Sequence, residues 1–253
     1  MEKVILERKR NGIVWLTINR PEKRNAIDFD VMDHFKTVID EVRHNKKDKM
    51  LVITGAGHRA FCSGGDLSEF HNLHTRDEAY SMLSKMGEIL YSLVTLPKPS
   101  VALLNGAAIG GGCEISSACD FRFASEKAKF GFVQGKLGIT TGWGGASMLL
   151  EKLPHDKAMT LLMTAHRFTA QEGYELGFIN KLLADQNLKE QCEAWLEAYI
   201  SQSTGVLEAY KRTAIRKWER TNLRERMFEE IEQCAILWES DEHHAAVKSF
   251  LDA

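Results

Sequence analysis

The chain has little of what divides a protein into parts or anchors it in a membrane. It contains only four prolines among 253 residues, and no stretch rich in proline, serine or glycine separates two halves. No apolar run approaches the ~18 residues that a membrane-spanning helix needs, and charged residues interrupt the segment where a secretory leader would be apolar. These absences predict one continuous body in the cytoplasm, with no membrane as a partner.

Neither sign of charge dominates, and the cysteines lack the spacing of a metal site. The net charge of −2 gives no reason to expect nucleic acid or an anionic membrane surface as a partner. The five cysteines are odd in number and unevenly spaced, which favours buried free thiols in a reducing compartment. We therefore expect no metal site, and a hydrophobic share of 44% is ample for a large core.

The hydrophobic pattern predicts alternating strands and helices, followed by a helical end. The expected strands are 4–7, 13–18, 50–54, 100–104 and 121–124, and the turn at 10–12 makes the first two a hairpin. Helices are expected at 31–42, capped by Asp28 or Asp30, and at 79–96. Further helices are expected at 146–153, 155–164, 170–176, 188–201, 205–217 and 223–251. Strand–helix units imply parallel strands joined by crossovers, so the predicted class is α/β with a helical C-terminal region.

Two glycine-rich segments carry the strongest functional signal. Residues 60–67 (AFCSGGDL) follow one expected strand and residues 105–114 (NGAAIGGGCE) follow another, and each leads toward an expected helix. Free N–H groups at a helix start favour negative charge, and two that converge form an oxyanion hole for an enolate or tetrahedral anion. Either segment alone also fits an ordinary strand-to-helix turn, but the pair is far more specific.

One acidic residue stands out next to the second glycine segment. Glu114 lies in the stretch 113–118, which is otherwise apolar or small, and burying a carboxylate there is costly without a purpose. Desolvation would raise its pKa toward the range of a general base. A carboxylate stabilised by the helix N-terminus is the competing structural interpretation, and the two roles are compatible.

These segments resemble the enoyl-CoA hydratase/isomerase (crotonase) superfamily. Residues 61–67 are similar to its F-x-A-G-A-D-L loop, and residues 105–114 are similar to its N-G-x-x-x-G-G-G-x-E segment. Residues 19–26 (NRPEKRNA), 130–145 and 167–177 match further blocks, so the resemblance covers nearly the whole chain. It implies a spiral of ββα units over residues 1–200 and a helical C-terminal trimerisation region over residues 201–253. It also implies an acyl-CoA thioester substrate, no separate cofactor, and a homotrimer or a dimer of trimers.

The resemblance also assigns site residues. The backbone N–H groups of Gly65 and Gly111 would hold the thioester oxygen, and Glu114 would be the first catalytic glutamate. For the CoA moiety it points to a binding group at Arg24, Ala26, Ser63 and Asp66, with Lys23 as an alternative to Arg24 near phosphate.

The chain departs from the family pattern at the second catalytic position. A two-glutamate hydratase has F-G-x-P-E here, whereas this chain has Gln134 at the glutamate position. Glutamine does not exchange protons at neutral pH, so addition of water by a pair of glutamates is in doubt. The block 132–145 resembles the alkylmalonyl-CoA decarboxylase branch more closely, and loss of CO₂ gives the same enolate without a base.

Three functions therefore remain open. The leading one is a hydratase-like enzyme that stabilises a thioester enolate, and the nearest rival is a methylmalonyl-CoA or ethylmalonyl-CoA decarboxylase. A third, from another class, is an RNA-binding member of the family that uses basic residues between 36 and 47. Acidic Asp40 and Glu41 interrupt that basic pattern, and the net charge is negative, which argues against it.

Overall fold

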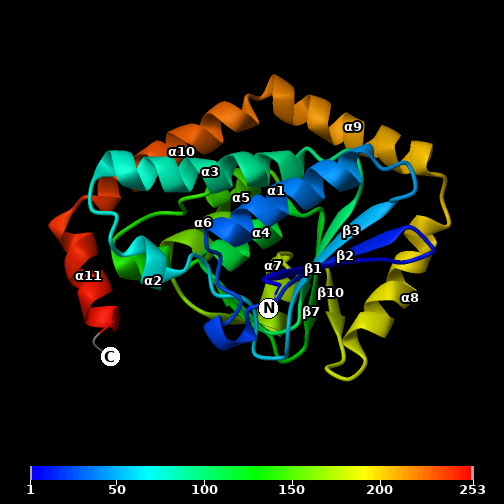
Figure 1. Cartoon of the computed structure of the whole chain (residues 1–253), viewed down its shortest axis with the longest axis horizontal. Coiled ribbons are helices and arrows are strands. Elements are labelled where there is room, and N and C mark those ends of the chain that lie inside the picture. The colour runs from blue at the N-terminus through cyan, green and yellow to red at the C-terminus, as the bar shows by residue number, and fades with distance from the viewer. Residues whose placement is uncertain (1, 252–253) are drawn as a thin grey trace.

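Two sheets form the centre of the molecule in the computed structural model, which describes residues 2–251 (Figure 1). The large sheet has the order β1-β2-β3-β5-β7-β10, and the small sheet has the order β4-β6-β8-β9. The strands of the large sheet are β1 (Val4–Arg8), β2 (Ile13–Ile18), β3 (Met50–Gly55), β5 (Ser100–Leu104), β7 (Phe121–Ser125) and β10 (Lys181–Leu183). Those of the small sheet are β4 (Ala60–Cys62), β6 (Ala107–Ile109), β8 (Lys129–Gly131) and β9 (Phe168–Thr169).

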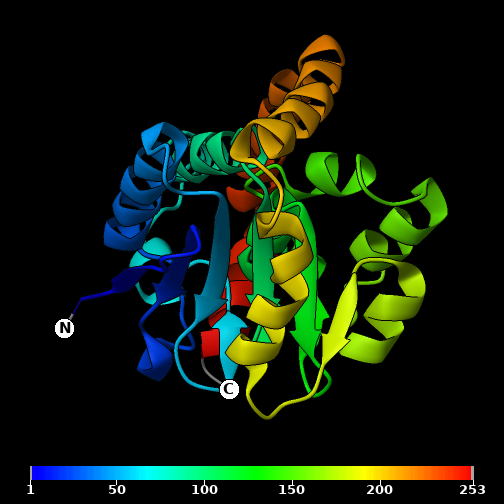
Figure 2. The same cartoon turned by 90° about the vertical axis from the view of Figure 1, so that its right-hand side faces the viewer.

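The large sheet is covered on both faces, which explains its nearly continuous apolar strands. On one face, Trp15, Val52 and Leu103 pack with Leu196 of α8 (Leu188–Ile200), and Figure 2 shows α8 lying over the sheet. Alternate residues of the same strands, such as Leu16 and Ile53, belong to the main core on the opposite face. The predicted hairpin is confirmed, because β1 pairs antiparallel with β2, and β2, β3, β5, β7 and β10 are all parallel neighbours.

The small sheet was not predicted, and it carries the functional loops. Its strands have two or three residues each, too few to show a periodic pattern. Strand β4 pairs in parallel with β6, with Cys62 opposite Ala108. The two glycine segments leave the same end of these neighbouring strands, and this brings them together.

The helices begin where local caps place them. Asp28, rather than Asp30, caps α1, because its side chain accepts a hydrogen bond from Val31 N. Thr75 and Glu78 form a capping box at the start of α3. The helices up to residue 176 are α1 (Phe29–His44), α2 (Leu67–Phe70), α3 (Arg76–Val94), α4 (Gly111–Ala118), α5 (Gly145–Leu150), α6 (His155–Met163) and α7 (Ala170–Leu176). Short 3₁₀ turns are η1 (Pro21–Lys23) and η2 (Gln134–Leu137).

The single helix predicted over 223–251 is wrong. The chain forms α9 (Thr204–Arg220), α10 (Leu223–Trp238) and α11 (Asp241–Leu251), and α10 packs along α3 (Figure 1). Ser240 starts a new helix, because its Oγ accepts a hydrogen bond from His243 N at 3.2 Å. Helix α11 turns away and contacts η2.

Four of the apolar residues Trp218, Met227, Phe228, Ile231, Ile236, Leu237 and Trp238 on the C-terminal helices are buried within the chain. Met227 and Ile231 of α10 are fully buried and Trp238 is 6% exposed, since α3 and α5 cover much of this helix; Trp218 of α9 is 7% exposed. Ile236 and Leu237 are the members of that set that stay exposed. The boundary predicted near residue 200 coincides with the end of α8, and the division into a core over 1–200 and a C-terminal region over 201–253 stays a prediction.

Two further observations bear on the environment of the chain. All five cysteines are free and buried, as the sequence predicts. Among the helices of the described residues, none combines the length and the apolar character that crossing a bilayer requires.

Candidate active site

Two backbone N–H groups without a partner face one cavity. Gly65 follows β4, and Gly111 is the first residue of α4, after β6. Within residues 2–251, neither N–H donates to a protein acceptor, and both glycines line a cavity of about 640 Å³. Unpaired N–H groups that converge on one space are the donors of an oxyanion hole.

The glycine at the start of α4 is required by a close approach. A Cβ at Gly111 would lie 2.1 Å from Cζ3 of Trp143, which is far inside van der Waals contact. Gly64 adopts a φ of +97°, a left-handed conformation that favours glycine, and a Cβ there would lie 3.1 Å from Gly111 N. Glycine at these two positions thus lets the two loops and Trp143 approach one another closely beside the cavity.

Glu114 lies one turn into α4 and is 2% exposed. Its Oε2 accepts hydrogen bonds from Trp143 N at 2.8 Å and Gly145 N at 2.9 Å. Its Oε1 accepts from Gln134 Nε2 at 2.9 Å and from Gly142 N at 3.3 Å. One loop, residues 142–145, therefore provides three of the four donors that hold this carboxyl group in place.

Burial and a second carboxyl group raise the pKa of Glu114 to about 8. Desolvation is the main cause, the charge of Glu230 adds to it, and the backbone N–H donors oppose it. Glu230 lies on α10 and accepts from Thr141 Oγ1 at 2.5 Å and Ser147 N at 2.7 Å, so it fixes the same loop from the other side. A carboxyl group with such a pKa exchanges protons readily near neutrality.

Gln134 reaches Glu114 from η2 and leaves one atom unpaired. Its Nε2 donates to Glu114, and its Oε1 is buried without a hydrogen-bond partner among the described residues. An amide donates through its NH₂ group to a carboxylate, and after rotation it accepts through its oxygen from a carboxylic acid. Gln134 can therefore pair with Glu114 in both protonation states.

The cavity has an apolar interior and a rim of exposed positive charges. Met82, Leu83, Ile139 and Trp143 contribute apolar surface. The basic rim comprises Arg24, Arg59, Lys129, Lys136 and Arg167. None of these five side chains forms an ion pair with another residue in the described part of the chain. Of these five, only Arg24 was predicted from the sequence to bind phosphate, because Arg59 and Lys129 lie outside the matched blocks, and Lys136 and Arg167 lie inside them without an assigned role.

The residues predicted for CoA binding are only partly brought to the cavity. Arg24 and Ser63 line it, whereas Ala26 and Asp66 do not. The carbonyl of Ala26 accepts from Arg20 Nη1 at 2.7 Å, and its N–H donates to Lys23 O. Asp66 is 4% exposed, caps α2 through Ser68 N, and pairs with Arg20 at 2.8 Å. Its contacts thus join the first glycine loop to the segment around Arg20.

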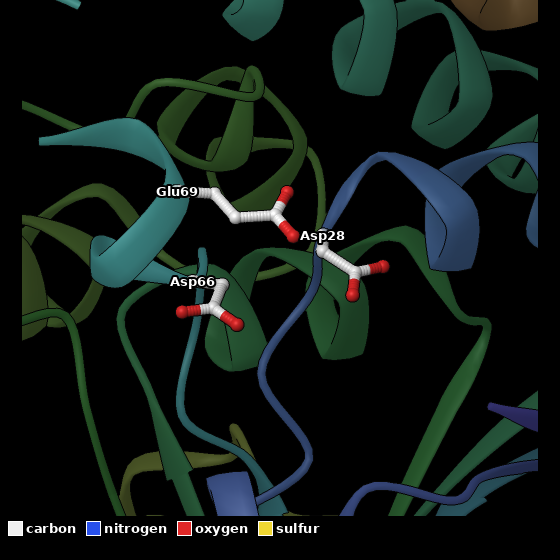
Figure 3. A group of neighbouring side chains, drawn as sticks. All are labelled: Asp28, Asp66 and Glu69. Atoms are coloured by element: carbon white, nitrogen blue, oxygen red, sulfur yellow. The ribbon is translucent and has the colours of Figure 1, made fainter. Parts of the chain in front are cut away.

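Asp66 also belongs to a group of three carboxylates, with Asp28 and Glu69, shown in Figure 3. Arg20 Nη2 lies 3.2 Å from Asp28 and 2.8 Å from Asp66, and Lys3 lies 2.7 Å from Asp28. These cations already compensate the two buried carboxylates. The group is therefore explained by loop anchoring and gives no argument for a metal ion.

The last two helices contribute residues that the sequence analysis missed. Cys234 and Trp238 of α10 and His243 of α11 all line the cavity. The signal for this arrangement was Ser240 followed by Asp241 and Glu242, a typical helix start inside what reads as one long helix.

Comparisons with known proteins agree with this geometry. The family model described as enoyl-CoA hydratase/isomerase matches residues 8–252. The chain is 32% identical over 212 residues to a short-chain-enoyl-CoA hydratase of Clostridium acetobutylicum, covering 83% of this chain and 80% of that protein. It is 34% identical over 214 residues to an ethylmalonyl-CoA decarboxylase of Xenopus tropicalis, covering 84% and 71%. A crystal structure of an enoyl-CoA hydratase/isomerase from Xanthobacter autotrophicus Py2 has the same fold, with a TM-score of 0.90, 23% identity, and coverage of 99% and 93%.

Proposed function

Because this chain belongs to the enoyl-CoA hydratase/isomerase family, we propose that it binds an acyl-CoA thioester and stabilises its enolate at Gly65 and Gly111. The observation that carries the proposal is the pair of unpartnered N–H groups facing one cavity. A thioester oxygen between them gains negative charge as the enolate forms, and preorganised donors stabilise that charge most in a dry site.

The reaction that we place first is the addition of water to a 2-enoyl-CoA. Water loses one proton to a base as its oxygen bonds to Cβ, the electron pair of the double bond moves to the thioester oxygen, and a proton is delivered to Cα as the enolate collapses. Glu114 supplies acid–base chemistry in this scheme, since its buried carboxyl group lines the cavity and its pKa is about 8.

The basic rim would hold the phosphates of CoA. Its five side chains, Arg24, Arg59, Lys129, Lys136 and Arg167, are exposed at the cavity and have no ion-pair partner within residues 2–251, as recognition of an anionic ligand requires. Ser63 lies beside Arg24 and would offer its backbone to the adenine. Ala26 and Asp66 would act from outside the cavity, because both bond to Arg20 and so shape the two loops that carry Arg24 and Ser63. Coenzyme A belongs to the substrate, so we propose no separate cofactor.

Decarboxylation of an alkylmalonyl-CoA is the second candidate, and Gln134 favours it. Loss of CO₂ leaves the same enolate at the same N–H pair, and only Cα then needs a proton. A neutral amide repels a substrate carboxylate less than a second glutamate would. The 34% identity to an ethylmalonyl-CoA decarboxylase supports keeping this candidate.

One experiment distinguishes hydration from decarboxylation. The purified protein is assayed with crotonyl-CoA for hydration and with ethylmalonyl-CoA for release of CO₂, at equal concentrations. Faster turnover of crotonyl-CoA supports the first candidate, and faster turnover of ethylmalonyl-CoA supports the second. Turnover of neither, with no binding of butyryl-CoA, contradicts the proposal.

We further propose a cytoplasmic homotrimer, or a dimer of trimers, that binds no nucleic acid. Five buried free cysteines suit a reducing compartment. Helices α5 and α10 are neighbours and expose apolar side chains, namely Leu150, Ile236 and Leu237. These side chains could be buried in a subunit interface. Lys36 is paired with Asp40 at 3.0 Å, which weakens the basic pattern that RNA binding would use.

A further inference from the structure

The C-terminal helix α11 places a histidine in the wall of the cavity. His243 is 2% exposed and lines the cavity together with Gly65, Gly111 and Glu114. Its backbone N–H is held by Ser240 Oγ at the start of α11. Its ring packs against Trp238, with 4.6 Å between the ring centres, and Trp238 is itself fixed by a hydrogen bond to Leu73 O.

The hydrogen bonds of His243 fix which of its ring nitrogens is free. Nδ1 lies 2.7 Å from Leu137 O, and a carbonyl only accepts, so Nδ1 carries the proton. The neutral ring then has a lone pair on Nε2. That atom has no hydrogen-bond partner in the described part of the chain, and it is not among the fully buried unpaired atoms, so it keeps some accessible surface.

The surroundings of His243 favour the neutral, basic form of the ring. Burial lowers its pKa, and so does the neighbouring His244, whereas the bond to Leu137 O opposes this. The position in the first turn of α11 also disfavours a positive charge. Titratable groups on the elements packed around it include Glu242 of α11, Lys136 of η2 and Cys234 of α10, with His74 beyond His244.

We propose that His243 is a catalytic residue, the base whose Nε2 takes a proton from the water that adds to the enoyl chain. This role rests on the proposed hydration, and it supplies the second proton-transfer group that the amide of Gln134 cannot supply. Environments that raise one pKa and lower another set up an acid and a base in one site, here Glu114 and His243.

The step balances with these two groups. An O–H bond of water breaks and its proton goes to Nε2, while oxygen bonds to Cβ and the double-bond pair moves to the thioester oxygen. The enolate then collapses, and the carboxyl proton of Glu114 bonds to Cα. His243 is left protonated and Glu114 ionised, and transfer of one proton between them through solvent restores the site.

Decarboxylation does not need this base. Breaking the bond to CO₂ supplies the electron pair of the enolate, and Glu114 alone protonates Cα. The two reactions therefore respond differently to a change at His243, and this difference tests the inference.

The decisive variant is His243→Asn. Asparagine keeps an N–H donor near the position of Nδ1, so the bond to Leu137 O is retained while Nε2 is lost. We expect crotonyl-CoA hydration to fall by about 10²-fold or more in kcat, as for loss of a positioned base, with KM changed little. The acid limb of the pH profile of kcat/KM, caused by protonation of His243, should disappear.

His244→Asn is the matched control, because His244 is the next residue of the same helix and does not line the cavity. It should retain the activity and keep an acid limb, moved toward higher pH, because the loss of His244 removes one of the causes that lower the pKa of His243. Thermal melting and titration with butyryl-CoA check that both variants fold and bind.

The outcomes are distinct. A wild type that hydrates crotonyl-CoA and a His243→Asn variant that does so equally well would overturn the role of His243 and leave the proposed function standing. Equal losses in both histidine variants would also overturn it, since they indicate damage to α11. A wild type that only decarboxylates overturns the hydration proposal, and the role of His243 with it.

Discussion

The position and the pKa of Glu114 depend on a few neighbouring residues. Glu114 is held by donors from a loop that is distant in sequence, and its pKa is raised mainly by burial and further by Glu230, which lies on another helix. The sequence predicts that Glu114 is buried and that its pKa is raised. It does not reveal Glu230, because that glutamate lies in a helix rich in exposed charges.

Replacing Glu114 by Gln should abolish proton transfer while preserving substrate binding. Glutamine has nearly the same shape and offers no titratable proton, so turnover should fall by about 10²-fold or more. Steady-state kinetics and titration with butyryl-CoA measure the two effects separately. Activity close to the wild type on the better substrate would mean that another group transfers the proton.

Glu114 also links stability to pH. Its folded pKa of about 8 lies above the ordinary value of 4.5, so the folded protein binds more protons between these values. Its contribution to stability is full below pH 4.5 and is lost as the pH rises through 8. The Tm of the Glu114→Gln variant, measured relative to the Tm of the wild type, should therefore be higher at pH 9 than at pH 5. A Tm difference that is the same at both pH values would contradict the shifted pKa.

Gln134→Glu tests the choice between the two reactions. The new carboxyl group would lie at hydrogen-bond distance from Glu114 and beside any substrate carboxylate. Decarboxylation should fall about tenfold, which corresponds to ~1.4 kcal/mol of added repulsion in the transition state. The ratio of crotonyl-CoA hydration to ethylmalonyl-CoA decarboxylation should rise accordingly. An unchanged ratio would show that residue 134 does not face the acyl carbons.

At the scale of elements, the start of α4 is the most constrained point of the site. Gly111→Val would drive Cβ into Trp143, where 2.1 Å separates the two atoms, and would move the N–H group. Loss of one oxyanion donor should lower kcat by about 10²-fold to 10³-fold. Overpacking should also lower the free energy of unfolding by about 1–3 kcal/mol.

Gly205→Ala in α9 is the matched control for this glycine. A Cβ there meets no heavy atom within 4 Å, and alanine favours the helix over glycine. The control should keep full activity, with stability equal to or slightly above that of the wild type. Equal kinetics in the two variants would argue against Gly111 as an oxyanion donor.

The longer elements were predictable from sequence, and the short ones were not. Strands β2, β3 and β5 and helices α1 and α3 are long enough to show their period and carry caps such as Asp28. Strands β4, β6, β8 and β9 are too short for any period, and contacts with the rest of the chain define them. The break at Ser240 was overlooked because apolar residues on both sides continue the helical spacing.

At the scale of the whole molecule, the subunit assembly is the main prediction. Leu150, Ile236 and Leu237 are exposed on one chain, and an assembly would cover them. Sedimentation at micromolar concentration should give the mass of three or six chains. A mass close to 28.6 kDa would contradict the trimer.

The wall of the cavity is assembled from both ends of the chain, and this has a consequence for biosynthesis. Strand β10, which completes the large sheet, ends at Leu183, well before Cys234, Trp238 and His243. A ribosome releases the N-terminal part first, so the sheets can form while the apolar side chains of Leu83 and Trp143 still lack their cover. Nascent chains should be most prone to self-association during that interval, when they would depend most on chaperones that shield exposed apolar surface.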